Sequence, residues 1–529
     1  MNRVVRYVIV VTSLLATSLG AAGTSPLVDA VRRGDHQAVR MLARDKAAVN
    51  VPEPDGTTAL HWAVQANDVE IVNTLIRAGA NVKAVNRYGI QPLTLAATNG
   101  SSAVVEALLK AGADAQSRTT AGEPVIMTAA RTGNAATLKV LIRYGANVNA
   151  REDWFGETAL MWAADENHAD AIRVLVEAGA EVNAKSTVLD APVLEFPRSG
   201  GPNSPLPRGG WTPLMFAARQ GAIDAARTLA DLHADLNVTA LPQTDVPLKP
   251  EEIKANANGV GTTPLVEAII NVHYDLAAML LEKGADPNIV DSSGMGALYA
   301  AVDMNSLQWV QGRPAPILTD RLDGSDLVKL LLEKGANPNA RLKSKPLKRH
   351  HDAGSTMNFG EGTTPLIRAA RTNDAAVMKS LLDAGANPFL NLPDRTTPLM
   401  IAAGSGYGGV RGDGIRIVVP TPEGAVDACR LLLDRGVDVD AFNNAGNTAL
   451  HAAVTRGDPV VAFLASRGAT LTLKNKAGLT PLDLARGTGG RGGRGGGRGG
   501  AVVRESTVKL LEQLIQDSAA KKSSAQLTP

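Results

Sequence analysis

A short tetrapeptide pattern returns along the chain about every 33 residues. It occurs twelve times: "SPLV" at Ser25, "TALH" at Thr58, "QPLT" at Gln91, "EPVI" at Glu123, "TALM" at Thr158, "TPLM" at Thr212, "TPLV" at Thr263, "GALY" at Gly296, "TPLI" at Thr364, "TPLM" at Thr397, "TALH" at Thr448 and "TPLD" at Thr480. Seven of the spacings lie between 32 and 35 residues, and the other four are longer, as if segments had been inserted. A period of this length indicates one small structural repeat that packs on its neighbours, so the chain is expected to form an array.

Each repeat follows the same local pattern. A threonine suited to cap a helix is followed by proline at the first helical turn, where a missing amide hydrogen costs nothing. A short alanine-rich helix such as "PLMFAARQG" comes next, and then a longer helix such as "EIVNTLIRAG". Glycine ends this second helix, because it tolerates the left-handed conformation that terminates a helix. The pattern predicts two helices and a turn in every repeat.

This pattern resembles the ankyrin repeat, best in "DGTTALHWAVQANDVEIVNTLIRAGANVKAVN" (Asp55 to Asn86) and "AGNTALHAAV", and the resemblance covers residues 24–516. It implies an all-α repeat solenoid of stacked helix-turn-helix repeats with short β-hairpin-type turns, curved into a superhelix. Each repeat would bury its apolar face only on its neighbours.

The histidine of "TALHWAV" returns in "TALHAAV", which argues against a lone catalytic or metal-binding group. The resemblance implies that such a histidine hydrogen-bonds within its repeat and to the next one. We therefore expect His61 and His451 to be structural. Trp62, Trp162 and Phe216 follow the tetrapeptide, where the family packs leucine, and we expect them in the core.

The N-terminal segment is typical of a secretory signal. Arg3 and Arg6 precede an apolar run that ends in "GAAG", which predicts a signal peptide over residues 1–22 and a periplasmic or secreted bacterial protein. An uncleaved anchor is the alternative, and no later segment could cross a bilayer. The sequence further predicts repeats one to five over 24–184 without insertions, repeats six to twelve over 185–516, and a disordered tail over 517–529.

Proline-, glycine- and serine-rich insertions interrupt the later repeats. They cover residues 185–210, 240–261, 305–324, 341–362, 404–424 and 487–504. Two interpretations stay open: tolerated surface loops, or arms that contact a partner.

The composition disfavours two classes of function. Lys+Arg number 54 against 52 Asp+Glu, so the strong basic balance of a nucleic-acid binder is missing and we expect no nucleic-acid partner. No catalytic motif is found, so we expect no cofactor, no metal and no enzymatic activity. The single Cys429 occupies an apolar helical position and is expected in the core. A metal site at His350, His351 and Asp352, and polyanion binding by the Arg-Gly-Gly run of 487–504, are the alternatives.

The resemblance implies that hairpin tips and the exposed end of the first helix bind a partner. On this chain those positions in repeats three to six hold Tyr88, Arg131, Trp154, Phe155, Asp165, Trp211, Arg219 and Gln220. Tyr, Trp and Arg are enriched among interface hot spots, so Tyr88, Trp154 and Trp211 are the predicted anchors. Alternatively, these aromatic side chains cap hairpins against neighbouring loops.

We therefore expect a monomeric, non-enzymatic scaffold for protein–protein interaction, exported from a bacterial cytoplasm. An enzymatic or metal-dependent site in the loops, or a secreted effector that acts on host proteins, remains the alternative.

Overall fold

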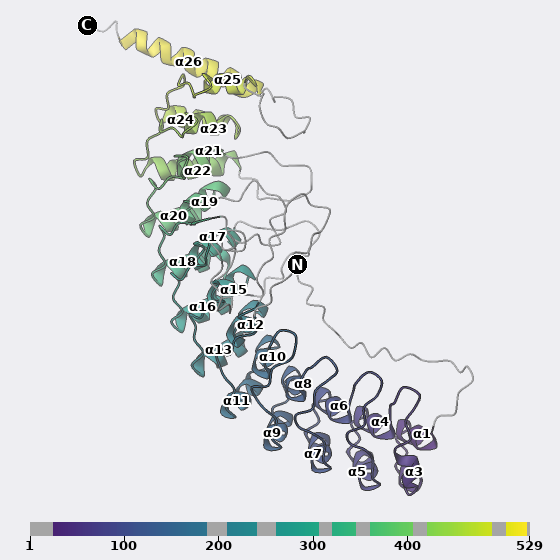
Figure 1. The fold of residues 1–529 in the computed structure, drawn as a ribbon. Helices are drawn as coiled ribbons and strands as arrows, with labels where there is room; N and C mark the ends of the chain where they lie inside the picture. The colour runs from purple at the N-terminus through teal and green to yellow at the C-terminus, as the bar shows by residue number, and fades with distance from the viewer. Residues whose placement is uncertain are drawn as a thin grey trace. The chain divides into compact units, whose positions relative to one another are not determined.

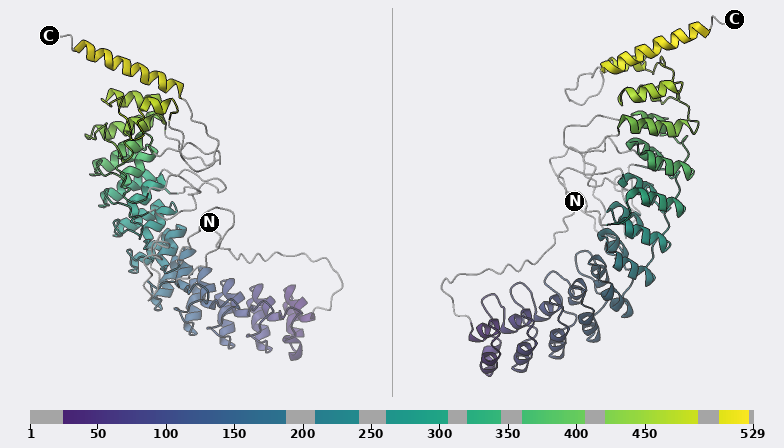
Figure 2. Two further views of the ribbon diagram at one scale, coloured as in Figure 1. Left: turned by 45° about the horizontal axis from the view of Figure 1, so that its top comes forward. Right: turned by 180° about the vertical axis from the view of Figure 1, so that it is seen from behind.

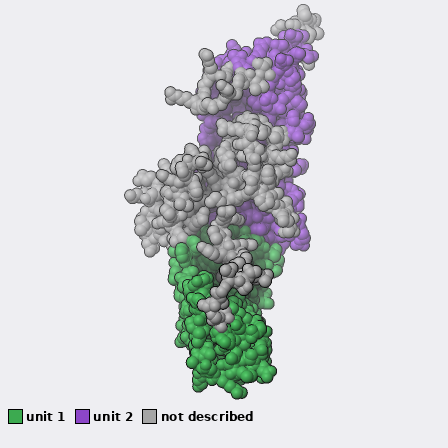
Figure 3. All heavy atoms as spheres, turned by 90° about the vertical axis from the view of Figure 1, so that its right-hand side faces the viewer, with its two compact units in different colours: residues 1–247 green, residues 248–529 purple. Residues whose placement is uncertain are grey.

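A computed structural model describes residues 25–187, 209–240, 261–305, 320–344, 360–405, 421–488 and 504–525. The chain divides into two compact units, residues 1–247 (unit 1) and 248–529 (unit 2) (Figure 3). The division that the sequence suggests after residue 184 marks where the insertions begin, and it is a different division from these two units.

Unit 1 contains thirteen helices among its described residues: α1 (Pro26–Arg32), α2 (His36–Leu42), α3 (Lys46–Val49), α4 (Ala59–Gln65), α5 (Val69–Arg77), α6 (Pro92–Thr98), α7 (Ser102–Lys110), α8 (Val125–Arg131), α9 (Ala135–Arg143), α10 (Ala159–Asp165), α11 (Ala169–Glu177), α12 (Pro213–Gln220) and α13 (Ile223–Asp231). Apart from the short α3, these form six consecutive pairs. The first helix of each pair, called the inner helix here, begins within the tetrapeptide, and the second is the outer helix.

Unit 2 continues the same order with six more pairs in the part of the chain that is described: α15 (Pro264–Ile270), α16 (Tyr274–Glu282), α17 (Ala297–Asn305), α18 (Gly324–Glu333), α19 (Pro365–Thr372), α20 (Ala375–Asp383), α21 (Pro398–Ala403), α22 (Pro422–Leu433), α23 (Ala449–Ala453), α24 (Asp458–Ser466), α25 (Pro481–Ala485) and α26 (Glu505–Ala525). Within each unit the pairs lie side by side, inner helix on inner helix and outer on outer (Figures 1 and 2). The predicted repeat solenoid of twelve helix pairs is confirmed.

Most helices begin and end at the residue types that the sequence predicts. Thr263 and Thr364 cap inner helices by accepting a hydrogen bond from the amide three residues on, and proline follows each. The outer helices end at glycines such as Gly79, whose φ of 94° is left-handed. In repeat six, His233 takes this place with a φ of 64°.

Side-chain amides join consecutive repeats along the outer-helix ends. Asn149 Nδ2 donates to the carbonyl of Gly179 at 3.0 Å, and Asn149 Oδ1 accepts from the amide of Glu181 at 2.9 Å. Asn339 does the same with Gly385 and Asn387 in unit 2. Because each bond reaches only the next repeat, this ladder stabilises the array locally.

Two expectations need correction. Repeat four begins its inner helix at Val125 with Pro124 as the capping residue, so its tetrapeptide is "PVIM" and lies one residue later than predicted. Helix α26 runs to Ala525, so the predicted disordered tail is wrong over 517–525. Most of each predicted insertion, and the predicted signal peptide, lie outside the described residues. Among the helices that are described, none has the length and apolar character needed to cross a bilayer.

Candidate functional site

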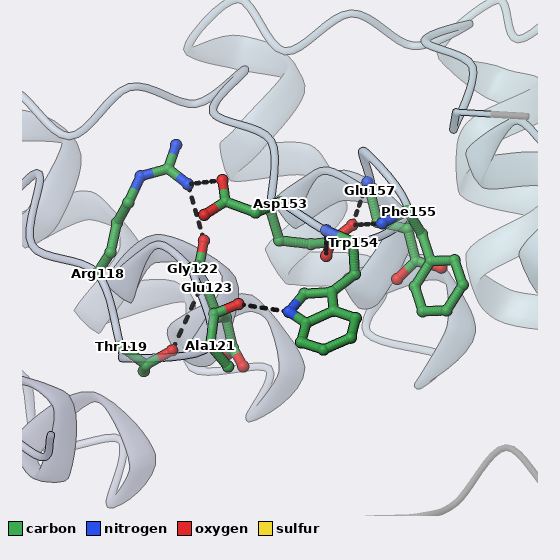
Figure 4. A network of polar contacts seen from close by, with 10 residues as sticks. Arg118, Thr119, Ala121, Gly122, Glu123, Asp153, Trp154, Phe155 and Glu157 are labelled. Carbon is green, nitrogen blue, oxygen red and sulfur yellow. Dashed lines mark hydrogen bonds and ion pairs between the residues drawn. The ribbon is translucent and has the colours of Figure 1, made fainter. Parts of the chain in front are cut away.

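Two neighbouring hairpins, residues 118–124 and 151–158, form the centre of the predicted surface (Figure 4). The glycines of the two turns, Gly122 and Gly156, are 34 residues apart instead of 33, so the second hairpin is one residue longer. The buried Glu152 holds this longer turn together. Its carboxylate accepts hydrogen bonds from the backbone amides of Trp154 and Phe155, each at 2.7 Å, and from that of Glu157 at 2.9 Å.

Trp154 links the two hairpins and is also the most exposed aromatic side chain of the described residues. At other junctions a backbone amide donates to the carbonyl of the preceding tip, as Thr187 does to Phe155 at 2.7 Å. Between these two hairpins the indole Nε1 of Trp154 donates to the Ala121 carbonyl at 2.9 Å (Figure 4). The side chain is nevertheless 66% exposed. Trp154 is therefore both a cap on the neighbouring hairpin and an available contact.

Two further predicted residues are exposed on the tips. Tyr88 is 57% exposed, with the Arg87 guanidinium 4.7 Å from its ring centre, and Phe155 is 47% exposed. The ring of Phe155 lies on the far side of Trp154 from the 118–124 hairpin (Figure 4). These tips present apolar rings to solvent.

The predicted charged residues lie at the ends of the inner helices. Arg219 Nη2, on α12, is 3.0 Å from Asp165 Oδ1 at the end of α10, and Gln220 Nε2 donates to the same carboxylate at 3.0 Å. Arg131, at the end of α8, is 3.4 Å from Glu123 Oε1. The structure thus brings Asp165, Arg219 and Gln220 together, whereas Arg131 pairs separately.

Arginine side chains cover the aromatic rings of this face. Arg131 lies 5.2 Å from the ring centre of Trp162, and Arg32 lies 4.1 Å from that of Trp62. The expectation that both tryptophans are core residues is wrong: each is half-buried, because its ring forms part of the inner-helix surface. Only Phe216 is a core residue as expected.

Trp211 differs from the other two predicted anchors. It is half-buried and packs on the core cluster of Met161, Ala184 and Phe216, with its ring edge-on to Phe216 at 5.7 Å. The Arg219 guanidinium lies 4.8 Å from its ring centre. Its contacts fit the alternative interpretation, a hairpin aromatic that packs on its own array.

Glu157 lies on the same hairpin but is not among the residues predicted from the sequence. It follows the turn of the 151–158 hairpin and is half-buried. Burial, followed by the nearby charges of Glu152 and Asp165, raises its pKa from 4.5 to about 7, although Arg219 acts in the opposite direction. The extra residue in the hairpin was the only signal in the sequence, because neither the burial nor the neighbours follow from the repeat pattern.

The two tetrapeptide histidines are structural. His61 Nδ1 accepts from the Thr58 amide at 3.2 Å, and its Nε2 lies 3.1 Å from the Ile90 carbonyl of the next repeat. His451 makes equivalent bonds to Thr448 and Leu479. Burial lowers the pKa of both histidines, which favours the neutral form of each ring.

The alternative sites fall largely outside the described residues. These include His350, His351 and Asp352, and residues 489–503 of the Arg-Gly-Gly run. Within the described ranges, no group of three or more His, Cys, Asp or Glu side chains could hold a metal ion. Cys429 is buried, and this burial raises the pKa of its thiol to about 12.

Comparison with known proteins identifies the repeat. A profile described as ankyrin repeats (3 copies) matches residues 5–86, 27–119, 93–186 and 321–411, and one described as ankyrin repeats (many copies) matches 160–230, 265–311 and 417–463. The chain is 31% identical over 193 residues to the Neurogenic locus Notch protein of Drosophila melanogaster, covering 36% of this chain and 6% of that protein. It is 28% identical over 231 residues to the B-cell lymphoma 3 protein homolog of Mus musculus, covering 43% and 41%.

A third relative is the human SH3 and multiple ankyrin repeat domains protein 2, which is 31% identical over 229 residues, or 39% of this chain and 10% of the relative. The chain thus spans less than half the length of these relatives. The solved ankyrin repeat domain of human ASB11 aligns over its whole length with 50% of this chain, at 24% identity and a TM-score of 0.37. The first profile matches over half of the chain, and helix pairs follow one another in both units. The chain therefore belongs to the ankyrin-repeat family.

Proposed function

We propose that this protein is a non-enzymatic scaffold that binds a protein partner through the hairpin tips and inner-helix ends of repeats three to six in unit 1. Ankyrin repeats in the chain, and relatives such as the B-cell lymphoma 3 homolog, support a role in protein–protein interaction. The site residues are those of the prediction, but Trp211 acts by packing and not as an anchor.

The proposal rests mainly on one observation: the side chain of Trp154 is exposed and yet held in one orientation. A tryptophan that is 66% exposed is costly to leave in water, yet its indole is fixed by a hydrogen bond to the neighbouring hairpin. A side chain that is already oriented loses little entropy when a partner covers it. Large apolar rings held in this way are the usual anchors of an interface.

The test is affinity capture from the envelope fraction of the native organism, with the full chain from residue 23 as bait. The test variant is Tyr88→Ala with Phe155→Ala, because neither side chain packs in the core. The control is Phe389→Ala with Phe442→Ala in unit 2, whose rings are similarly exposed at 57% and 55%. Capture is compared only between baits whose melting temperatures agree with that of the wild type.

We expect the wild type and the control to capture the same protein and the test variant to lose it. Equal capture by test and control variants would place the contact elsewhere and contradict the proposal.

The proposal includes export to the periplasm or beyond. It is supported by the apolar run behind Arg3 and Arg6. The N-terminal sequence of the native protein, recovered from periplasm or medium, checks this: a chain that starts near residue 23 supports export. A full-length chain confined to the cytoplasm would contradict it.

A further inference from the structure

Three ion pairs lie on the face formed by repeats four to six. Arg118 Nη1 is 3.0 Å from Asp153 Oδ1, Arg131 pairs with Glu123, and Arg219 pairs with Asp165. The first pair joins neighbouring hairpins, the second lies within repeat four, and the third joins neighbouring inner helices. They leave the face with little net charge to offer at those positions.

The remaining charged groups of the 151–158 hairpin are also satisfied, with one exception. The carboxylate of Glu152 accepts three backbone amides. Arg151 Nη1 donates to the carbonyls of Gly156 and Lys185, each at 2.7 Å. Within the described residues, no hydrogen bond or ion pair reaches the side chain of Glu157.

Glu157 therefore combines partial burial with an unmatched charge. The charged groups that face it are Glu152 on its own hairpin, Asp165 on α10 and Arg219 on α12. Two of the three are acidic, and the single base is held by Asp165 at 3.0 Å. A cation supplied by a partner would give the last unpaired charged side chain of this hairpin an ion-pair partner.

Apolar surface lies on the same hairpin as this carboxylate. Trp154 and Phe155 precede Glu157 on the same hairpin, and their rings are exposed. A lysine or arginine side chain has an apolar stem and a charged end, so it can contact the rings and reach the carboxylate at once. An acidic or phosphorylated segment would meet unfavourable charge here.

We propose that the partner is a protein segment whose lysine or arginine side chain pairs with Glu157, while its apolar neighbours pack on Trp154 and Phe155. This rests on the proposed function, because it names the chemistry recognised by the same surface. The partial protonation of Glu157 near neutral pH fits this role: pairing with a cation favours the ionised form, so binding releases a proton.

The test uses the full chain and a library of random dodecapeptides displayed on phage. Peptides that bind the wild type but not the Tyr88→Ala, Phe155→Ala variant are synthesised, and each lysine or arginine is replaced in turn by norleucine. Affinities are measured for the wild type, for Glu157→Gln and for Glu70→Gln, a control that removes a carboxylate outside this face. Glutamine has nearly the same shape as glutamate, so Glu157→Gln removes the charge without removing packing.

We expect one basic position in the peptides to be essential. Its replacement by norleucine, or Glu157→Gln, should weaken binding about 10-fold, and the two changes together should cost little more than either alone. Binding to the wild type should tighten from pH 6 to pH 8, and binding to Glu157→Gln should not.

The other outcomes separate the two proposals. Peptides that need the hairpin rings but bind Glu157→Gln as tightly as the wild type would overturn the basic-segment inference and leave the scaffold function in place. A selection with no peptide dependent on Tyr88 and Phe155 would overturn both.

Discussion

At the scale of single residues, Trp62 and Trp162 occupy equivalent places with different partners. Trp62 Nε1 donates to Glu53 Oε2 at 2.6 Å, whereas in repeat five the corresponding glutamate, Glu152, is used by the hairpin amides. Trp162 Nε1 is consequently buried without a hydrogen-bond partner in the described structure. An unsatisfied buried donor of this kind costs about 1–3 kcal/mol.

This difference gives a matched pair of variants. Phenylalanine removes the indole N–H at both sites and a similar volume of side chain. Trp62→Phe should therefore destabilise the protein by at least about 1 kcal/mol more than Trp162→Phe, which relieves a penalty. Urea unfolding of the two variants measures the difference, and equal losses would contradict this account of Trp162.

Val272 is a second local conflict. It lies at the turn between α15 and α16 with a φ of 68°, a conformation that is unfavourable for a β-branched residue. Val272→Gly should stabilise unit 2 by about 1 kcal/mol. The reverse change is available at Gly34, which has a φ of 66° and nothing within 4 Å of an added Cβ. Gly34→Val should destabilise unit 1 by a similar amount. Thermal unfolding should therefore show a higher melting temperature for Val272→Gly and a lower one for Gly34→Val, and shifts of the same sign would contradict this account.

At the scale of elements, the 151–158 hairpin links stability to pH through Glu157. Its pKa of about 7 in the folded protein exceeds the 4.5 of a free carboxyl, so the folded state binds more protons between these values. Stability therefore falls as pH rises through this interval. Glu157→Gln should leave stability unchanged near pH 4.5 and raise it above pH 7, on the order of 1 kcal/mol after allowance for solvent. A variant that is less stable at pH 8 would contradict the burial of this charge.

The elements also show what the sequence could predict. Helix starts at threonine and proline, and helix ends at glycine, are encoded locally, so the twelve pairs and the structural roles of His61 and His451 were predictable. The first residue of the inner helix in repeat four was not predictable, because "GEPV" places proline at the capping position instead of at the first helical position. Glu157 and the cover of Trp162 by Arg131 depend on contacts between repeats and on one extra hairpin residue. A pattern averaged over twelve repeats does not contain such differences.

At the scale of the whole molecule, the side-chain ladder predicts that damage stays local. Asn149 and Asn339 occupy equivalent places in units 1 and 2, and each makes two hydrogen bonds to the next repeat. Replacement by alanine removes both bonds, at a cost of about 1–2 kcal/mol. Because stability in a repeat array is a sum of terms between neighbours, the loss should reach adjacent repeats and fade beyond them.

Hydrogen exchange followed by mass spectrometry tests this with each variant as the control of the other. Asn149→Ala should speed exchange in α9, α11 and their neighbours and leave unit 2 unchanged, and Asn339→Ala should do the reverse in α18 and α20. Locally confined loss would allow the hairpins of unit 1 to be altered for binding studies without disturbing unit 2. Faster exchange throughout the chain from either variant would instead mean that the two units unfold as one cooperative body, and the nearest-neighbour account would then be wrong.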